Sequence, residues 1–241
     1  MSHTHDHTHV MLVLGAGIGG RGVALTAVAN QSTDWHIVVV DRDADLAAGL
    51  AQAVQSAGGT AESASVDLTD LAAVEHFRDA LLVRLGRVDA VIHLVGGWRG
   101  STTVDADAIA AWAALLPGVV TTVQTTSVAF REPLAEAASG RFVMVTSTAA
   151  AHPTQSNAAY ASAKSAAAAW VRALGDSFRD TPASACIVAV KALVDPADRA
   201  ANPHRKYPGY TDTTELGQRI VDLVSTRGLA PVTELDLTKA L

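Results

Sequence analysis

Short apolar runs alternate with alanine-rich or amphipathic stretches along this chain. The runs have the length and composition of buried strands, and the stretches between them have a helical pattern. Strands that alternate with helices predict an α/β fold, a doubly wound parallel sheet with helices on both faces and a single domain over 10–241. The predicted strands are 10–14, 36–40, 63–66, 88–95, 142–145, 185–190 and the edge strand 232–238, and the predicted helices are 23–30, 44–58, 71–86, 105–130, 156–174 and 211–226.

A glycine-rich turn, GAGIGGRG, joins the first predicted strand to the first helix. Such a turn lets the backbone approach a pyrophosphate, which then lies at the N-terminus of the helix. Gly15, Gly17 and Gly20 fit the spacing G-x-G-x-x-G, whereas Gly15, Gly19 and Gly22 fit a wider spacing. The strand, turn and helix together predict a dinucleotide site, with the register of the glycines open.

An acidic residue, Asp41, ends the second predicted strand. A carboxylate at this place accepts hydrogen bonds from the adenosine ribose and repels a 2′-phosphate, which favours NAD(H). Arg42 follows and could bind a 2′-phosphate, so NADP(H) stays the alternative. Asp41 could also act only as a cap for the helix over 44–58.

The ends of the third and fourth predicted strands carry further candidates. Asp67 and Leu68 follow the third strand and could lie beside the adenine ring, although Asp67 or Asp70 could instead cap the next helix. Gly96 and Gly97 follow the fourth strand, and two glycines there indicate a backbone close to a ligand.

The most informative stretch runs from Ser147 to Lys164 and reads STAAAHPTQSNAAYASAK. Ser147 lies at the carboxyl end of the fifth predicted strand, where ligands bind in open α/β sheets. Tyr160 and Lys164 are four residues apart in a helical run, so they share one face. A phenol has a pKa near ~10, and a lysine cation one turn away lowers that pKa. Together with a serine hydroxyl that bonds to a substrate oxygen, the set suits proton transfer coupled to hydride transfer, whereas Tyr and Lys alone are typical of any amphipathic helix.

Four further features of the sequence carry predictions. Trp98 walls a substrate pocket or covers the edge of the core. Pro117-Gly118 interrupts the helix over 105–130 and predicts a kink. Residues 195–210 form a long polar segment with three prolines, and a loop of that length is often a lid. The histidine-rich residues 1–9 predict a disordered tail, although such a tract can bind metal; no other metal site is expected.

Composition narrows the partners and the compartment. The net charge of -6 and the lack of a dense Lys/Arg run argue against nucleic acid and an anionic membrane as partners. The single cysteine, Cys186, lies in an apolar run and is expected to be buried. Neither a signal peptide nor an apolar run of about 18 residues is present, so a cytoplasmic location is expected.

The order of these motifs resembles the short-chain dehydrogenase/reductase family from about residue 10 to the end. The resemblance implies a Rossmann-type fold and an NAD(P)-dependent oxidoreductase that acts on a small molecule and forms a homodimer or homotetramer. It also implies that Tyr160 is the general acid/base, that Lys164 binds the nicotinamide ribose and lowers the tyrosine pKa, and that Ser147 orients the substrate oxygen. The cofactor-binding positions that it implies are Gly15, Gly17, Ile18, Gly19, Gly20, Asp41, Arg42, Asp67, Leu68, Gly96, Gly97, Tyr160, Lys164 and Val194.

Several positions depart from the family pattern. The segment 93–96, HLVG, replaces N-N-A-G, Val119 takes the place of an asparagine that feeds a proton relay, and Lys191-Ala192 replaces P-G. Residues 88–100 and 190–199 resemble quinonoid dihydropteridine reductases, although those enzymes lack the serine found here as Ser147. The sequence thus favours an NADH-dependent reductase of a carbonyl or imine-like bond. A non-catalytic NAD(P)-binding redox sensor is the alternative, and the intact Ser/Tyr/Lys set argues against it.

Overall fold

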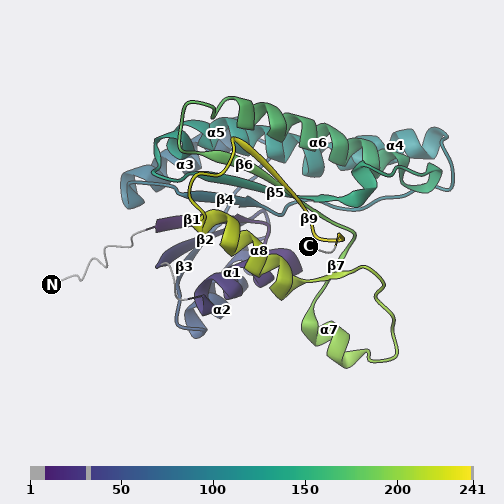
Figure 1. Ribbon diagram of the computed structural model, residues 1–241, viewed down its shortest axis with the longest axis horizontal. Helices are drawn as coiled ribbons and strands as arrows, with labels where there is room; N and C mark the ends of the chain where they lie inside the picture. Colours follow the sequence, from purple (N-terminus) through teal and green to yellow (C-terminus); the bar gives the residue numbers. More distant parts are fainter. Residues whose placement is uncertain (1–8, 31–33, 240–241) are drawn as a thin grey trace.

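Seven parallel strands form one sheet at the centre of the computed structural model, which describes residues 9–30 and 34–239. Their order is β3-β2-β1-β4-β5-β6-β9, so the chain runs from β1 out to one edge and then returns to build the other half (Figure 1). The doubly wound, seven-stranded Rossmann-type fold expected from the sequence is confirmed. The strands are β1 (His9–Leu14), β2 (Trp35–Asp41), β3 (Thr60–Ser65), β4 (Ala90–His93), β5 (Arg141–Ser147), β6 (Ser184–Val190) and β9 (Val232–Asp236).

Helices cover both faces of this sheet (Figure 1). Because side chains alternate along a strand, β1 contributes to two cores: Met11 and Val13 pack on one side, and Leu12 and Leu14 on the other. The first side is covered by α1 (Ile18–Ala29), α2 (Ala44–Ser56) and α8 (Thr213–Ser225), and the second by α3 (Leu71–Leu85), α4 (Ala106–Leu116), α5 (Thr122–Glu136) and α6 (Ala158–Asp176).

Aspartates cap the helices that follow β2 and β3. Asp43 caps α2, because its carboxylate accepts bonds from two backbone N–H groups of the first turn. Asp70 caps α3 in the same way. The alternative roles of Asp41 and Asp67 as helix caps are therefore wrong, and both carboxylates are left for other contacts.

Several strand boundaries differ from the sequence expectation: β3, for example, begins at Thr60 and not at residue 63, and β9 ends at Asp236 and not at residue 238. β1 starts at His9, inside the expected tail, and the rest of that tail, residues 1–8, lies outside the described residues. β4 is shorter than the predicted 88–95, although the N–H groups of Asp89 and Leu94 each still donate to a β1 carbonyl at 2.9 Å. Beyond Leu94 the chain leaves the sheet, so the glycines that follow lie at its carboxyl edge.

The expected kink at Pro117-Gly118 is a π-helical turn over Pro117–Thr121. It joins α4 to α5 without a break, and the N–H of Thr122 bonds to the carbonyl of Pro117 five residues earlier. By length and composition alone, Ala106–Glu136 could cross a membrane, but a helix of an ordinary domain passes the same test. Here it packs against α3 and α6.

The segment over 195–210 is not the irregular loop that its composition predicts. It contains α7 (Pro196–Ala201) and is closed at its base by the parallel pair β7 (Leu193–Val194) and β8 (Thr211–Asp212). Inside it, the Arg199 guanidinium donates to Asp212 at 2.8 and 3.0 Å. Its role as a lid stays a prediction.

Glycines allow α1 and α8 to cross at close range. A Cβ on Gly22 would lie 2.7 Å from the Cβ of Thr213 and closer still to the Thr213 carbonyl oxygen. A Cβ on Gly217 would lie 2.7 Å from the carbonyl oxygen of Gly22. Since these neighbours are backbone atoms, a side chain at either position would push the two helices apart.

We expect Gly22→Ala to destabilise the protein by about 1–3 kcal/mol, because the methyl group meets the backbone of α8. The matched control is Gly49→Ala in α2, where nothing lies within 4 Å of the added methyl group. That change should stabilise the protein by about 1 kcal/mol through helix propensity. Urea denaturation measures both, and equal stability of Gly22→Ala and the parent would contradict the close crossing.

Candidate functional site

A cavity of about 1010 Å³ opens at the carboxyl edge of the sheet, where the strand order reverses between β1 and β4. In open α/β sheets this switch point is the usual place of a ligand. Residues from the loops after β1, β2, β3 and β4 line it. Those that the sequence singled out are Gly15, Gly17, Asp41, Arg42, Asp67, Leu68, Gly96 and Gly97.

The geometry of the glycine-rich turn favours the narrower register. Gly15 has a φ of +102°, which favours glycine, and its N–H donates to the carbonyl of Val40 at 2.8 Å. Gly17 has open space around its Cβ position. A Cβ on Gly20 would overlap the carbonyl oxygen of Gly15. Turn, ligand approach and helix packing are the three roles of a dinucleotide-binding glycine set, and the geometry of positions 15, 17 and 20 fits them.

The N-terminus of α1 faces this cavity with free backbone donors. Gly17 is the N-cap and makes no side-chain cap bond, so the first N–H groups of α1 have no such acceptor. A helix N-terminus in this state attracts an anion such as a phosphate. The turn therefore fits a pyrophosphate.

Six implied cofactor positions do not line the cavity: Tyr160 and Lys164 on α6, and four residues near the glycine-rich turn and in β7. Ile18 is 45% exposed, and Gly19 packs toward the side chains of Leu94 and Leu193. Gly20 is buried against the turn, and Val194 is buried in β7. In this structure these four residues support the site and do not form its surface.

Asp41 ties the glycine-rich turn to the end of β2. One carboxylate oxygen accepts from the N–H of Ala16 at 2.8 Å and the other accepts from the N–H of Asp43 at 3.0 Å. Arg42 is exposed beside it and lines the cavity. Hydrogen bonds from Thr69, with a smaller contribution from the charge of Arg42, lower the pKa of Asp67. The carboxylates of Asp41 and Asp67 and the guanidinium of Arg42 therefore lie at the same end of the cavity.

Ser147, Tyr160 and Lys164 come together at the carboxyl edge. Ser147 is the last residue of β5, is buried, and accepts a bond from the N–H of Ala149 at 3.2 Å. Tyr160 and Lys164 share a face of α6, with the ammonium 6.0 Å from the centre of the phenol ring. The lysine Nζ also donates to the carbonyl of Val145 at 3.1 Å.

Burial governs the acid–base properties of this set. It raises the pKa of Tyr160, and a side-chain hydrogen bond with Ser147 opposes that rise. It lowers the pKa of Lys164 to about 8. The ammonium of Lys164, 6.0 Å from the ring centre, is not among the causes that shift the tyrosine pKa, so the expected lowering of that pKa by the lysine is not found. A Cβ on Gly96 would lie 3.4 Å from the lysine Nζ, so the ammonium reaches the cavity edge.

One wall of the cavity is absent from the sequence predictions. It comes from the end of α4, the π turn and the start of α5, and it includes Leu115, Gly118, Val119 and Thr122. Val119, at the position of the usual family asparagine, is 2% exposed and packs in an apolar cluster. In the sequence, only the Pro-Gly pair and the family position of Val119 hinted at this wall, because the packing of one helix across the sheet edge leaves no local pattern.

Trp98 lies 72% exposed on the loop after β4. It borders a shallow hollow together with Asp107, Ser156 and Asn157, at the start of the helix that carries Tyr160. The alternative in which Trp98 covers the edge of the core is therefore wrong. An exposed aromatic ring beside the candidate catalytic helix is available to a substrate.

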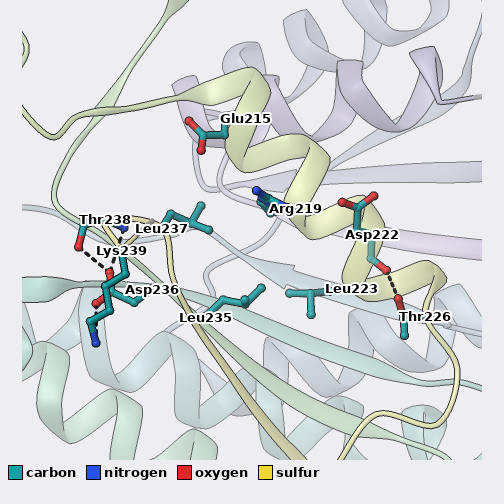
Figure 2. Close-up of a pocket in the computed structure, with 10 residues that line it drawn as sticks. All are labelled: Glu215, Arg219, Asp222, Leu223, Thr226, Leu235, Asp236, Leu237, Thr238 and Lys239. Carbon is teal, nitrogen blue, oxygen red and sulfur yellow. Dashed lines mark hydrogen bonds and ion pairs between the residues drawn. The ribbon is translucent and has the colours of Figure 1, made fainter. Parts of the chain in front are cut away.

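A smaller cavity of about 390 Å³ lies between α8 and the end of β9. Figure 2 shows Leu223 and Leu235 facing each other across it, and Asp236 pairs with Lys239 at 3.3 Å. None of the candidate catalytic or cofactor residues lines this cavity. The candidate site is the larger cavity at the switch point.

Comparison with protein families identifies the class. The family model of short chain dehydrogenases matches residues 9–196, which is well over half of the chain. The chain belongs to the short-chain dehydrogenase/reductase family, and it is an NAD(P)-dependent oxidoreductase of that family. No match is found among the curated proteins.

Solved structures share the fold over nearly the whole chain. NAD⁺-bound xylitol dehydrogenase is 18% identical, with a TM-score of 0.81 over 97% of this chain and 98% of that chain. A short-chain type dehydrogenase/reductase from Mycobacterium ulcerans is 20% identical, with a TM-score of 0.79 over 95% and 89%. An actinorhodin polyketide ketoreductase with NADPH is 20% identical, with a TM-score of 0.79 over 95% and 95%. At these identities the likeness shows the fold alone.

The buried charge of Lys164 predicts a pH-dependent stability. Its folded pKa of about 8 lies below the usual lysine value of 10.5, so the unfolded chain binds more protons between these pH values. Stability should therefore rise with pH in this window, by about 3 kcal/mol relative to Lys164→Met. Urea titrations of both proteins from pH 7 to 10.5 measure the difference, and parallel curves would contradict a buried ammonium.

Proposed function

We propose that this dehydrogenase/reductase transfers hydride between a nicotinamide cofactor and a small carbonyl, alcohol or imine-like substrate, with Ser147, Tyr160 and Lys164 as its catalytic residues. The observation that carries the proposal is the convergence of these three side chains beside the cavity at the switch point. When bound, the nicotinamide supplies or accepts the hydride. Tyr160 Oη donates the proton to the substrate oxygen or nitrogen, and Ser147 Oγ hydrogen-bonds the same atom.

Lys164 has two tasks in this proposal. Its ammonium, at the cavity edge beside Gly96, hydrogen-bonds the ribose next to the nicotinamide. Its charge also favours the phenolate of Tyr160 once a substrate displaces water from the site, because an apolar environment strengthens the attraction between opposite charges. The backbone carbonyl of Val145 holds the lysine in place meanwhile.

The cavity fits a dinucleotide in one orientation. The free N–H groups of α1 bind the pyrophosphate, and Asp41, Arg42, Asp67 and Leu68 surround the adenosine half. The end near Gly96 and Lys164 then receives the nicotinamide. We favour NAD(H), since the carboxylate of Asp41 repels a 2′-phosphate, with NADP(H) bound through Arg42 as the alternative.

NADH should bind more tightly than NADPH. In Asp41→Asn, the ratio of the NADH affinity to the NADPH affinity should fall by roughly tenfold. The asparagine oxygen keeps one acceptor for the backbone N–H groups that Asp41 holds, but the repelling charge is gone. Fluorescence titration with both cofactors measures the ratio. Arg42→Ala is the matched variant, and tighter NADPH binding that this variant abolishes would mean that Arg42 sets the preference.

Two observations favour a flat molecule as the substrate that the enzyme reduces. The exposed Trp98 beside the start of α6 offers a stacking surface, and the segment around it resembles quinonoid dihydropteridine reductases. A quinonoid dihydropterin is therefore the first substrate to test, alongside simple carbonyl compounds. The second candidate function is a redox sensor without catalysis, and the raised pKa of Tyr160 is the observation that favours it.

We also propose that the protein forms a homodimer or homotetramer in the cytoplasm. Ile109 on α4, Val128 on α5 and Trp170 on α6 are large apolar side chains that are 72%, 49% and 39% exposed. They lie on the helices of one side of the sheet (Figure 1). A second copy of the chain would cover such a surface.

The Tyr160→Phe variant distinguishes a catalytic oxidoreductase from a redox sensor that only binds the cofactor. It keeps the ring and removes only the hydroxyl, so turnover should fall by ~10²-fold or more, while NADH affinity stays within about twofold. Lys164→Ala should impair both turnover and NADH binding. Steady-state kinetics and cofactor titration of the two variants, with NADH and NADPH against carbonyls and quinonoid pterins, make the measurement. Near-normal turnover by a folded Tyr160→Phe protein would sink the proposal.

A further inference from the structure

A buried polar contact joins the end of β4 to the helix that walls the cavity. His93, the last residue of β4, is 1% exposed, and Thr122, the first residue of α5, is 3% exposed. The His93 Nε2 and the Thr122 Oγ1 lie 3.0 Å apart. The imidazole also stacks on Phe142 of the neighbouring strand, with ring centres 6.4 Å apart, so its orientation is fixed.

The direction of this hydrogen bond follows from the second contact of the threonine. The Thr122 hydroxyl donates to the carbonyl of Gly118 at 2.9 Å. With the hydroxyl proton on the carbonyl of Gly118, the Thr122 oxygen accepts from the histidine, so we assign the hydrogen of the ring to Nε2. Burial, and the nearby charge of Lys164, lower the pKa of His93 to about 3, so the imidazole is neutral.

The π turn packs on α6 through Val119 and Val120, and the contact with His93 adds a polar link from the turn to the sheet. Pro117 has no N–H, and the helix widens to a π turn over Pro117–Thr121. Gly118, Val119 and Thr122 all line the cavity. A π turn is rare and is frequent at functional sites. The chain from His93 through Thr122 to Gly118 fixes it from the sheet.

This chain lies at one end of the cavity. Leu94, which follows His93, lines the cavity, and Gly96 beyond it lies beside the Nζ of Lys164. Asp41 and Asp67 line the same cavity, and the first turn of α5 also reaches Leu68, whose carbonyl accepts from Thr125 at 2.5 Å. The π turn packs on α6, the helix that carries Lys164, next to the place proposed for the nicotinamide.

We propose that His93 is a positioning residue: its Nε2–H···Oγ1 bond to Thr122 fixes the π turn as the wall against which the nicotinamide end of the cofactor binds. The inference rests on the proposed function, since it assumes a nicotinamide cofactor in this cavity. His93 touches neither substrate nor cofactor and acts through Thr122 and Gly118. Because the ring of His93 is neutral, it places no second positive charge beside Lys164.

The test is a double-mutant cycle on NADH affinity with a hydroxyl-deletion control. His93→Phe removes the donor, Thr122→Val removes the acceptor, and His93→Gln keeps an N–H donor on a side chain of similar reach. Thr126→Val is the control, because Thr126 is also buried on α5 but donates only to backbone carbonyls of its own helix and does not line the cavity. Fluorescence titration gives the affinities, and thermal unfolding shows which variants are folded.

We expect His93→Phe and Thr122→Val each to weaken NADH binding about fivefold to tenfold, and the double variant to weaken it no further. His93→Gln should recover most of the loss, and Thr126→Val should bind as the parent does. Parent-like affinity in folded His93→Phe and Thr122→Val, or losses that multiply in the double variant, would overturn the role of His93. No binding of NADH or NADPH by the parent itself would overturn the proposed function instead.

A measurement on the parent protein covers the case in which the variants fail to fold. ¹⁵N NMR of the imidazole should show the neutral ring with hydrogen on Nε2 from pH 5.5 to pH 9. Saturation with NADH should shift the Nε2 proton, because the wall that it supports contacts the cofactor. A ring with hydrogen on Nδ1 alone, a ring that titrates within this range, or a signal unmoved by bound NADH would each refute the proposal.

Discussion

Parallel pairing of β1 with β2 on one side and β4 on the other is the constraint on which the site depends. The chain must run outward to β3 and return before it can form β4, so the loops after β1 and β4 diverge. The cavity lies in the gap that they leave. Hydrogen bonds from Gly15 to Val40 and from Ala16 to Asp41 then lock the glycine-rich turn to the neighbouring strand, so the floor of the site is part of the sheet.

The same edge concentrates polar side chains in a buried environment. Lys164 is 8% exposed and His93 is 1% exposed, and an ammonium without a carboxylate partner is costly there. The carbonyl of Val145 is the only hydrogen-bond acceptor within the described residues that the structure gives the lysine. A buried ammonium of this kind lowers the stability of the fold. Its presence is explained where an oxygen atom of a ligand completes the hydrogen bonds of the lysine. The site therefore lowers the stability of the protein locally, and the buried ammonium responsible is the group that the proposed chemistry uses.

Two of the departures from the family pattern, at His93 and at Val119, form one connected region in space. Val119 belongs to the π turn, and His93 lies beneath that turn and bonds to it through Thr122. A kink that the family builds around an asparagine is built here around Pro117, which lacks an N–H, and is supported from the sheet. Loss of the asparagine is thus accompanied by a different polar support at the same wall, so it does not by itself argue against catalysis.

The sequence by itself determined the order and type of nearly all elements, and the positions of Ser147, Tyr160 and Lys164, because apolar runs, strand ends and i,i+4 spacing are local properties. Tertiary structure decided what local patterns leave open. Packing of α5 on the sheet placed Thr122 against His93 and made this helix a cavity wall. Burial, which depends on segments far apart in the chain, raised the tyrosine pKa where neighbouring charge alone predicted a lower one.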